Sequence, residues 1–282
     1  LIFYIIQSIR GKTFFNKEFW RFALSFSIPL IPHYLSQIVL GQSDRIMIDK
    51  MIGASEAAIY GVSYNLAAVI TLFVNAINNS FVPTLYESLK SKKCENIKKV
   101  AAFLAIFMAG LICVFMLFGP EILTVFVAPE YIKAKWIFPP VAASMFFTFI
   151  YVFYVNVEFY FEKTNYVMFV SVLGAVVNII LNLVFIKKYG FIAAGYTTVF
   201  SYIVFCFAHY LLYKYIAKKE KTGNVYNDGI FMILGIAVLA FMLICILLYK
   251  FNIVRYILIA LIAVFAVIFR KKLLYAFKKA LN

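Results

Sequence analysis

The sequence predicts an all-α integral membrane protein with about eight transmembrane helices. Of its 282 residues 65% are hydrophobic, whereas soluble domains are about 45–50% apolar. The mean hydropathy is +0.94. A bilayer core is about 30 Å thick and needs roughly 20 mostly apolar residues per spanning helix. Apolar stretches of that length occupy residues 22–43, 57–80, 100–118, 136–157, 166–186, 191–213, 230–249 and 253–270.

Basic residues alternate between the gaps, and this pattern predicts the orientation. The chain has 27 Lys and Arg against 12 Asp and Glu, a net charge of +15. Most of the Lys and Arg residues lie in the N-terminal segment, in residues 87–99 and 214–228, and in the C-terminal tail. Since positive charge stays inside, these parts and both chain ends are predicted to be cytoplasmic, in a multi-pass protein of the plasma membrane. The charge therefore needs no nucleic-acid partner, and membrane lipid is the expected one.

Four segments are expected along the chain. Residues 1–9 are apolar but too short to cross, so they are interpreted as the end of a preceding transmembrane helix and the chain as a fragment. Residues 10–213 hold the first six full spans. Residues 214–229 form a polar cytoplasmic linker, and residues 230–282 hold two additional helices and a basic tail.

Signatures of catalysis are missing from the sequence. It has two histidines and lacks the GxSxG, HExxH and GxxxxGK[ST] motifs. Its four cysteines form neither a CxxC motif nor a cluster with histidine. The sequence thus predicts a protein that is not an enzyme and has no cofactor or metal.

The first full span carries two helix-disrupting residues, Pro29 and Pro32. Proline removes a helix donor and clashes with the carbonyl one turn earlier, so a kink is expected here. Both a static kink and a moving hinge are consistent with the sequence.

Polar residues follow the kink at helical spacing. His33, Gln37, Gly41 and Asp44 recur every three or four residues and form one stripe, with Arg45 on the adjoining face. Such a stripe is predicted to face the bundle interior or water, because hydrocarbon disfavours charged groups. Hydrogen bonding between helices is the alternative role for His33 and Gln37. For Asp44 and Arg45 the alternative is a place at the outer water interface.

Amides mark the second and fifth spans. The second carries Tyr64, Asn75, Asn78 and Asn79, whose polar groups are suited either to sugar hydroxyls or to joining helices. In the fifth, Gly174, Asn178 and Asn182 are typical of a packing seam with polar contacts. Elsewhere, Asn156, Glu158 and Glu162 end the fourth span and are expected in water. The isolated His209 is interpreted as a packed or interfacial histidine.

Residues 20–89 carry a family resemblance. A Ser-Ile-Pro-Leu start, an Asp-Arg pair late in the same helix, a Gly-Ala turn and an Ile-Tyr-Gly-x-x-Tyr opening follow in order. The chain resembles the C-terminal half of oligosaccharide flippases of the Wzx type. These belong to the polysaccharide-transporter branch of the MOP superfamily, which also holds multidrug (MATE) exporters. The later stretches GPEILTVFVAPEYIKA and GFIAAGYTT fit the same family.

The resemblance implies a fold, a substrate and residue roles. The eight spans would form the C-terminal lobe of a MATE-like flippase, six helices in the lobe proper and two more after it. The substrate would be an oligosaccharide on polyprenyl pyrophosphate, moved to the outer leaflet by alternating access, with polysaccharide assembly proteins as further candidate partners. Arg45 would pair with the pyrophosphate. Asp44 would hold Arg45 or carry a coupling proton or sodium ion, and Pro29 and Pro32 would form the hinge.

Other functions fit parts of the sequence. A MATE-type drug/cation antiporter or a lipid II-type flippase has the same expected fold. An integral membrane sugar polymerase or acyltransferase fits less well, because the outer loops are short.

Overall fold

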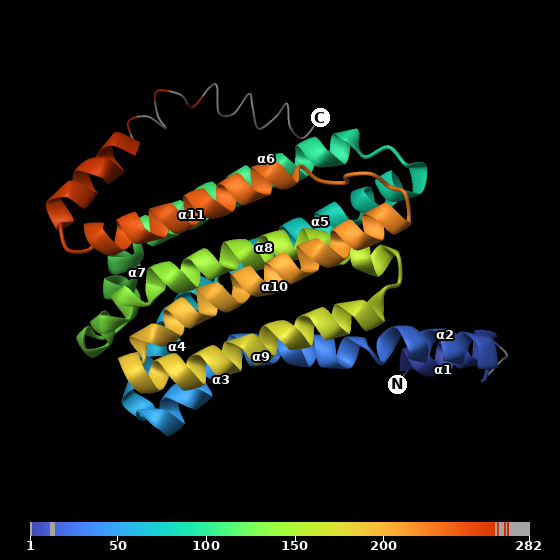
Figure 1. Ribbon diagram of the computed structural model, residues 1–282, viewed down its shortest axis with the longest axis horizontal. Coiled ribbons are helices and arrows are strands. Elements are labelled where there is room, and N and C mark those ends of the chain that lie inside the picture. The colour runs from blue at the N-terminus through green and yellow to red at the C-terminus, as the bar shows by residue number, and fades with distance from the viewer. Residues whose placement is uncertain (1, 12–14, 263, 265–267, 269, 271–282) are drawn as a thin grey trace.

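The computed structural model describes residues 2–11, 15–262, 264, 268 and 270, and every regular element among them is a helix. Long helices run side by side along one direction and alternate in sense (Figure 1). Their bounds are α1 (Ile2–Gly11), α2 (Lys17–Ser27), α3 (Leu30–Met51), α4 (Ala54–Ala68), α5 (Ile70–Ser91), α6 (Glu95–Leu117), α7 (Gly119–Phe126), the 3-10 helix η1 (Pro129–Trp136), α8 (Phe138–Tyr160), α9 (Thr164–Tyr189), α10 (Ile192–Lys219) and α11 (Asp228–Leu248).

Seven helical stretches in the described part of the chain are long and apolar enough to cross a membrane. They match the first seven predicted spans to within two residues or enclose them, so the all-α membrane fold class is confirmed. For the eighth, Asn252–Ile262 is a shorter apolar helix. The remainder of 253–270 falls largely outside the described residues, as does the end of the basic tail, residues 271–282.

The first span is interrupted at Pro29, where a kink is expected from the sequence. Helix α2 ends at Ser27, two turn residues follow, and α3 starts at Leu30 with Pro29 as its N-cap. Pro29 has no N–H to donate, and Ile31 N donates to Ile28 O at 3.1 Å in a tighter turn. Pro32 lies in the first turn of α3, where a missing donor costs little. The helical hydrogen-bond pattern is therefore interrupted between α2 and α3, where the sequence predicts a kink.

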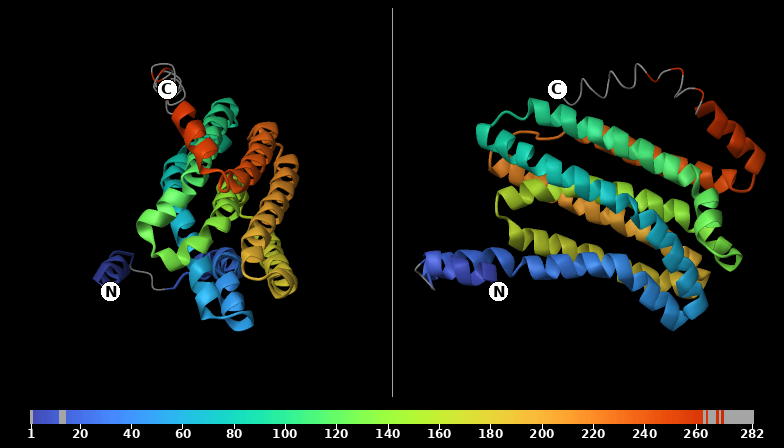
Figure 2. Two further views of the ribbon diagram at one scale, coloured as in Figure 1. Left: turned by 90° about the vertical axis from the view of Figure 1, so that its left-hand side faces the viewer. Right: turned by 180° about the vertical axis from the view of Figure 1, so that it is seen from behind.

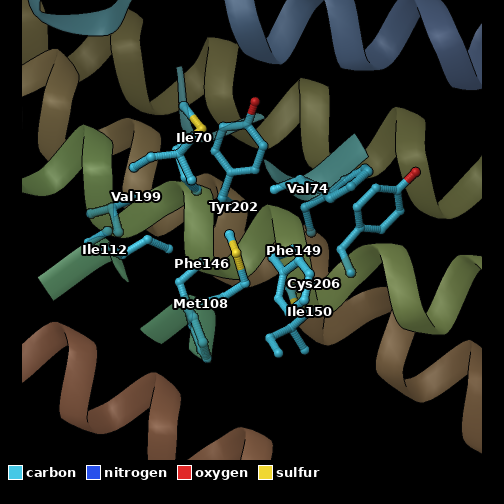
Figure 3. Packing of buried hydrophobic residues seen from close by; sticks show 14 of the residues in the cluster. Ile70, Val74, Met108, Ile112, Phe146, Phe149, Ile150, Val199, Tyr202 and Cys206 are labelled. Carbon is cyan, nitrogen blue, oxygen red and sulfur yellow. The ribbon is translucent and has the colours of Figure 1, made fainter. Parts of the chain in front are cut away.

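Helix α8 is the centre of the bundle. It packs against α10, α6, α4, α5 and α11, and most of its side chains are buried. Figure 3 shows its Phe146, Phe149 and Ile150 meeting side chains of three neighbours. These are Ile70 and Val74 of α5, Met108 and Ile112 of α6, and Val199, Tyr202 and Cys206 of α10. Helices α3 and α9 pack together on one side of this centre, and α6 and α11 on the other (Figures 1 and 2).

The segment between α10 and α11 is tied to the bundle. Helix α10 continues to Lys219, six residues into the stretch expected as a linker. The hydroxyl of Tyr213 accepts hydrogen bonds from Val225 N and Tyr226 N, and Tyr226 donates to Phe153 O at 2.8 Å. Burial raises the pKa of Tyr226 well above its usual value, so this phenol stays protonated and remains a donor. The contacts fix the start of α11 against α8.

At the opposite end, α7 and η1 fill the gap between α6 and α8. Glu121 of α7 accepts two bonds from Arg255, both at 2.5 Å, in a bidentate pair. Partial burial acts to raise the pKa of Glu121, but the bonds from Arg255 and Tyr256 outweigh it and hold this pKa below its usual value. The pair ties the residues after α11 to the α7 segment while Glu121 is ionised, and acid weakens it.

The close contact between α9 and α10 depends on a residue without a side chain. A Cβ on Gly174 would lie 2.5 Å from Cδ2 of the buried Phe205 ring. We expect Gly174→Ala to lower the unfolding free energy by about 1–3 kcal/mol, because a packed ring has to move. Thermal unfolding in detergent measures this. Gly110→Ala is the control, since no atom lies within 4 Å of that Cβ. Equal unfolding temperatures for the two variants would contradict the packing argument.

Candidate functional site

A polar seam runs between α3 and α9. On α9, Ser171, Asn178 and Asn182 are buried and bond to residues of α3. They meet the stripe predicted on α3, in which His33 and Asp44 are fully buried and Gln37 is half-buried. Two separate groups of polar side chains result, one near each end of the seam.

We name the first group the Asp44 cluster. It joins α3, α4, α9 and α10 and consists of Ser43, Asp44, Tyr60, Asn178, Asn182, Thr197 and Thr198. Asp44 Oδ2 accepts from Tyr60 at 2.5 Å and from Thr198 at 2.6 Å. Asp44 Oδ1 accepts from Asn178 at 3.3 Å and from Asn182. Every contact to this carboxylate comes from a neutral group.

The charge of Asp44 is thus left without a cation in the protein. None of the ion pairs among the described residues includes Asp44, and its neighbour Arg45 points to another helix. The hypothesis that Asp44 holds Arg45 is therefore wrong for this structure. Consecutive residues on a helix lie about 100° apart, so one faces the seam while the next faces α4. A buried carboxylate of this kind favours a neutralising ligand, such as a proton or a metal cation.

Arg45 lies on the partly open side of the α3–α4 contact. Its Nη2 donates to Asn65 Oδ1 at 2.7 Å, and its guanidinium carbon lies 5.0 Å from the centre of the Tyr64 ring. The side chain runs past Gly61, where a Cβ would contact Arg45 Cδ at 3.7 Å. Its Nε has no hydrogen-bond partner. Arg45 therefore places a half-buried guanidinium, with its Nε covered, beside an exposed amide and an aromatic face.

We name the second group the histidine cluster. It consists of His33, Gln37, Tyr151, Glu158, Ser171 and His209, from α3, α8, α9 and α10. His33 Nδ1 lies 2.6 Å from Ser171 Oγ, which lies 3.2 Å from His209 Nε2. His209 Nδ1 lies 2.8 Å from Glu158 Oε2.

This cluster corrects two expectations. Glu158 and Asn156 are buried, although the sequence suggested solvated side chains; only Glu162 of the three is exposed. His209 is buried beside a carboxylate and a second histidine, so it does not stand alone. The cause is the central place of α8, which keeps the sides of its last turns covered. The sequence offered one signal of this burial: two polar residues, Asn156 and Glu158, lie close together at the end of an otherwise apolar span.

The amides of the second span separate. Asn78 accepts from Asn156 at 2.7 Å and joins α5 to α8, whereas Asn75 and Asn79 are exposed. The predicted site residues therefore form no single pocket here. Asp44, Gln37 and His33 face the seam, Tyr64 and Arg45 meet at the α3–α4 contact, and Asn75 and Asn79 point away from the bundle. No cluster of three or more His, Cys, Asp or Glu suited to a metal occurs within the described ranges.

Comparison with known proteins tests the resemblance. Residues 1–89, which include α1 to α5 and Arg45, match the family described as polysaccharide biosynthesis protein. A protein of the Lsg locus of Haemophilus influenzae is 27% identical over 160 residues, covering 56% of this chain and 40% of the relative. The resemblance to polysaccharide biosynthesis proteins is therefore supported over residues 1–89. The chain spans about two-fifths of the length of the curated relatives it matches.

Solved structures confirm the fold. A multidrug resistance MATE family transporter of the MOP superfamily, in an outward-facing conformation, superposes with a TM-score of 0.53 at 20% identity, covering 67% of this chain and 44% of that one. A MOP superfamily transporter from Pyrococcus furiosus gives a TM-score of 0.51 at 16% identity, covering 78% and 51%. The chain therefore has a MATE-like transporter fold, and it is a multi-pass membrane protein.

The Asp44 cluster is expected to hold the seam together. Asn182 donates to Asp44 and accepts from Thr197, so Asn182→Ala removes two buried hydrogen bonds. We expect a loss of about 1–3 kcal/mol in unfolding free energy. Thermal unfolding in detergent, with Asn79→Ala at an exposed amide as the control, gives the comparison. An unchanged midpoint for Asn182→Ala would mean that the seam contributes nothing to stability.

Proposed function

We propose that this chain is the C-terminal part of a flippase for oligosaccharides carried on polyprenyl pyrophosphate. The family match at residues 1–89 and the MATE-like fold support transport in polysaccharide synthesis. The substrate moves from the cytoplasmic to the outer leaflet of the plasma membrane, and polysaccharide assembly proteins are its proposed partners.

The observation that carries the proposal is the placement of Arg45. A pyrophosphate cannot cross about 30 Å of hydrocarbon without a substitute for water. Arg45 offers a half-buried planar guanidinium on α3, whose Nε lies below the surface. Guanidinium binds phosphate oxygens through two parallel bonds, which a lysine cannot reproduce. The nearby Tyr64 and Asn65 add an aromatic face and an amide suited to sugar.

Asp44 takes a different role from Arg45. Its enclosure on all sides removes it from direct contact with a bulky substrate, and its charge without a cation suits a small coupling ion. Carboxylate, hydroxyl and amide oxygens are groups that hard cations prefer. We therefore assign Asp44 to the coupling proton or sodium ion.

The break in the first span provides a position at which α2 and α3 can move relative to each other. Alternating access requires one lobe to rock against the other around the substrate. The turn at Ile28–Pro29 separates α2 from α3, and we propose it as the hinge, with Pro32 stiffening the first turn beyond it. The basic ends of the helices, by the positive-inside rule, place α2 and the turn on the cytoplasmic side.

Replacing Arg45 tests the substrate proposal in the full-length protein. In a strain that lacks the flippase gene, we expect Arg45→Ala to restore less than about one-tenth of the surface polysaccharide, because a charge-assisted bidentate contact is worth roughly 1.5–3 kcal/mol. Arg45→Lys should restore an intermediate amount. Lys50→Ala, at an exposed position of the same helix, is the control for expression and charge.

Full restoration by both Arg45 variants, at equal membrane levels, would remove Arg45 from the site. Loss of cationic dye export on deletion, with polysaccharide intact, would overturn the flippase in favour of a drug antiporter of this fold.

Replacing Asp44 tests the coupling role. In proteoliposomes we expect Asp44→Asn to abolish the dependence of substrate transfer on a sodium or proton gradient, because the neutral amide no longer attracts a cation. Asp49→Asn, exposed on the same helix, should keep that dependence. Measuring transfer with each gradient separately identifies the ion. A gradient dependence that survives in Asp44→Asn would contradict the assignment.

A further inference from the structure

The histidine cluster has no part in the function proposed above. Both histidines of the chain lie in it, together with a glutamate, and all three side chains are fully buried. Glu158 Oε1 is buried and has no hydrogen-bond partner. Such a group of ionisable side chains is costly inside a membrane bundle, which points to a task.

The hydrogen bonds of the cluster have one consistent direction. Gln37 Nε2 lies 2.8 Å from His33 Nε2, and an amide nitrogen only donates, so His33 Nε2 accepts. His33 Nδ1 then carries the proton and donates to Ser171 Oγ. Ser171 in turn donates to His209 Nε2, and His209 Nδ1 donates to Glu158. With both histidines neutral and Glu158 ionised, the cluster carries one uncompensated negative charge.

We propose that the histidine cluster binds one proton and relays it from His33 to His209. The arriving proton forms an N–H bond at His33 Nε2. The proton on His33 Nδ1 then passes to Ser171 Oγ, and the original hydroxyl proton of Ser171 passes to His209 Nε2. Each bond that breaks is matched by one that forms. His33 ends neutral in its other tautomer, and His209 ends as an imidazolium beside ionised Glu158.

The geometry favours this step. The His33–Ser171 and Ser171–His209 contacts are kept with their directions reversed, and the His209–Glu158 contact keeps its direction. The proton on His33 Nε2 finds an acceptor in Tyr151 Oη at 3.3 Å, or in the Gln37 amide turned over. The net charge of the cluster goes from −1 to zero, which removes an uncompensated charge from a dry interior. A proton reaches the cluster from the side of Gln37, because this side chain is only half-buried.

The surroundings add no other strong charge. From α3 the ring of Tyr34 lies 5.0 Å from that of His33, and from α8 Tyr151 lies beside both histidines. Helix α9 contributes Ser171, and α10 contributes His209 and Phe205. No Lys or Arg in the described part of the chain pairs with Glu158. His209 is therefore the only basic group against this carboxylate within those ranges.

The proton site is distinct from the Asp44 cluster. His33 and Asp44 are eleven residues apart on α3, about 16 Å along a helix axis. His33 lies in the second turn after Pro29, next to the break in the span. The inference does not rest on the sugar substrate, because it concerns a proton alone.

Histidine-selective ¹⁵N NMR on the full-length protein in detergent tests the relay, with His33→Gln and His209→Gln to assign the signals. On proton uptake by the cluster we expect the signal of an imidazolium at His209 while His33 exchanges one neutral tautomer for the other. In Ser171→Ala, His209 should still titrate, but the tautomer of His33 should no longer follow it.

Glu158→Gln tests the acceptor end. We expect the imidazolium signal of His209 to be lost, because no carboxylate then lies beside the added positive charge. Glu162→Gln, exposed at the same helix end, should leave the titration unchanged. The proposal fails if His33 keeps one tautomer throughout, if both histidines become charged independently, or if Ser171→Ala leaves them coupled. The Ser171 variant decides the matter even where Glu158→Gln does not fold.

Discussion

Polar side chains inside this bundle have only one another for partners, and that constraint organises the contact between α3 and α9. A hydrocarbon interior offers no water, so each buried hydroxyl, amide or charge must find its hydrogen bonds across a helix interface. Asp44 and His33 lie at the two ends of the seam, and α9 supplies a partner for each through Asn182 and Ser171. The register of α3 against α9 is thereby fixed at two points.

Much of this fold could be predicted from hydropathy, because a bilayer sets the length and the apolar character of a spanning helix. The inward stripe was also predictable, since residues three or four apart share a face. Helical spacing equally placed Arg45 beside the stripe rather than in it. It did not exclude a pair between Asp44 and Arg45, because long side chains can bend toward each other. The structure separates them, since α4 offers Arg45 the amide of Asn65 and the ring of Tyr64.

Hydrogen bonds between residues from distant parts of the chain could not be predicted from the sequence. Thr198 reaches Asp44 across 154 residues, and His209 reaches Glu158 across 51. A single sequence gives the position of a residue along a span but not which helices surround it. Glu158 was placed in water for this reason, because it lies near the end of an apolar stretch. The place of α8 in the middle of the bundle, a tertiary property, buries it instead.

The two buried clusters bear on one mechanical element. Helix α3 carries an acidic group at one end of the seam and a histidine at the other, and it begins immediately after a break in the helix ladder. A ligand shifts a conformational equilibrium only by its difference in affinity for the two states. In the proposals made above, a proton on the histidine cluster and an ion at Asp44 each change the charge of a cluster that contacts α3 and α9. Two such ligands that favour the same position of α3 strengthen each other's binding, and this reciprocity is required by linkage. Coupling between the two ends of the seam thus needs no contact between the sites, only the rigidity of α3 itself.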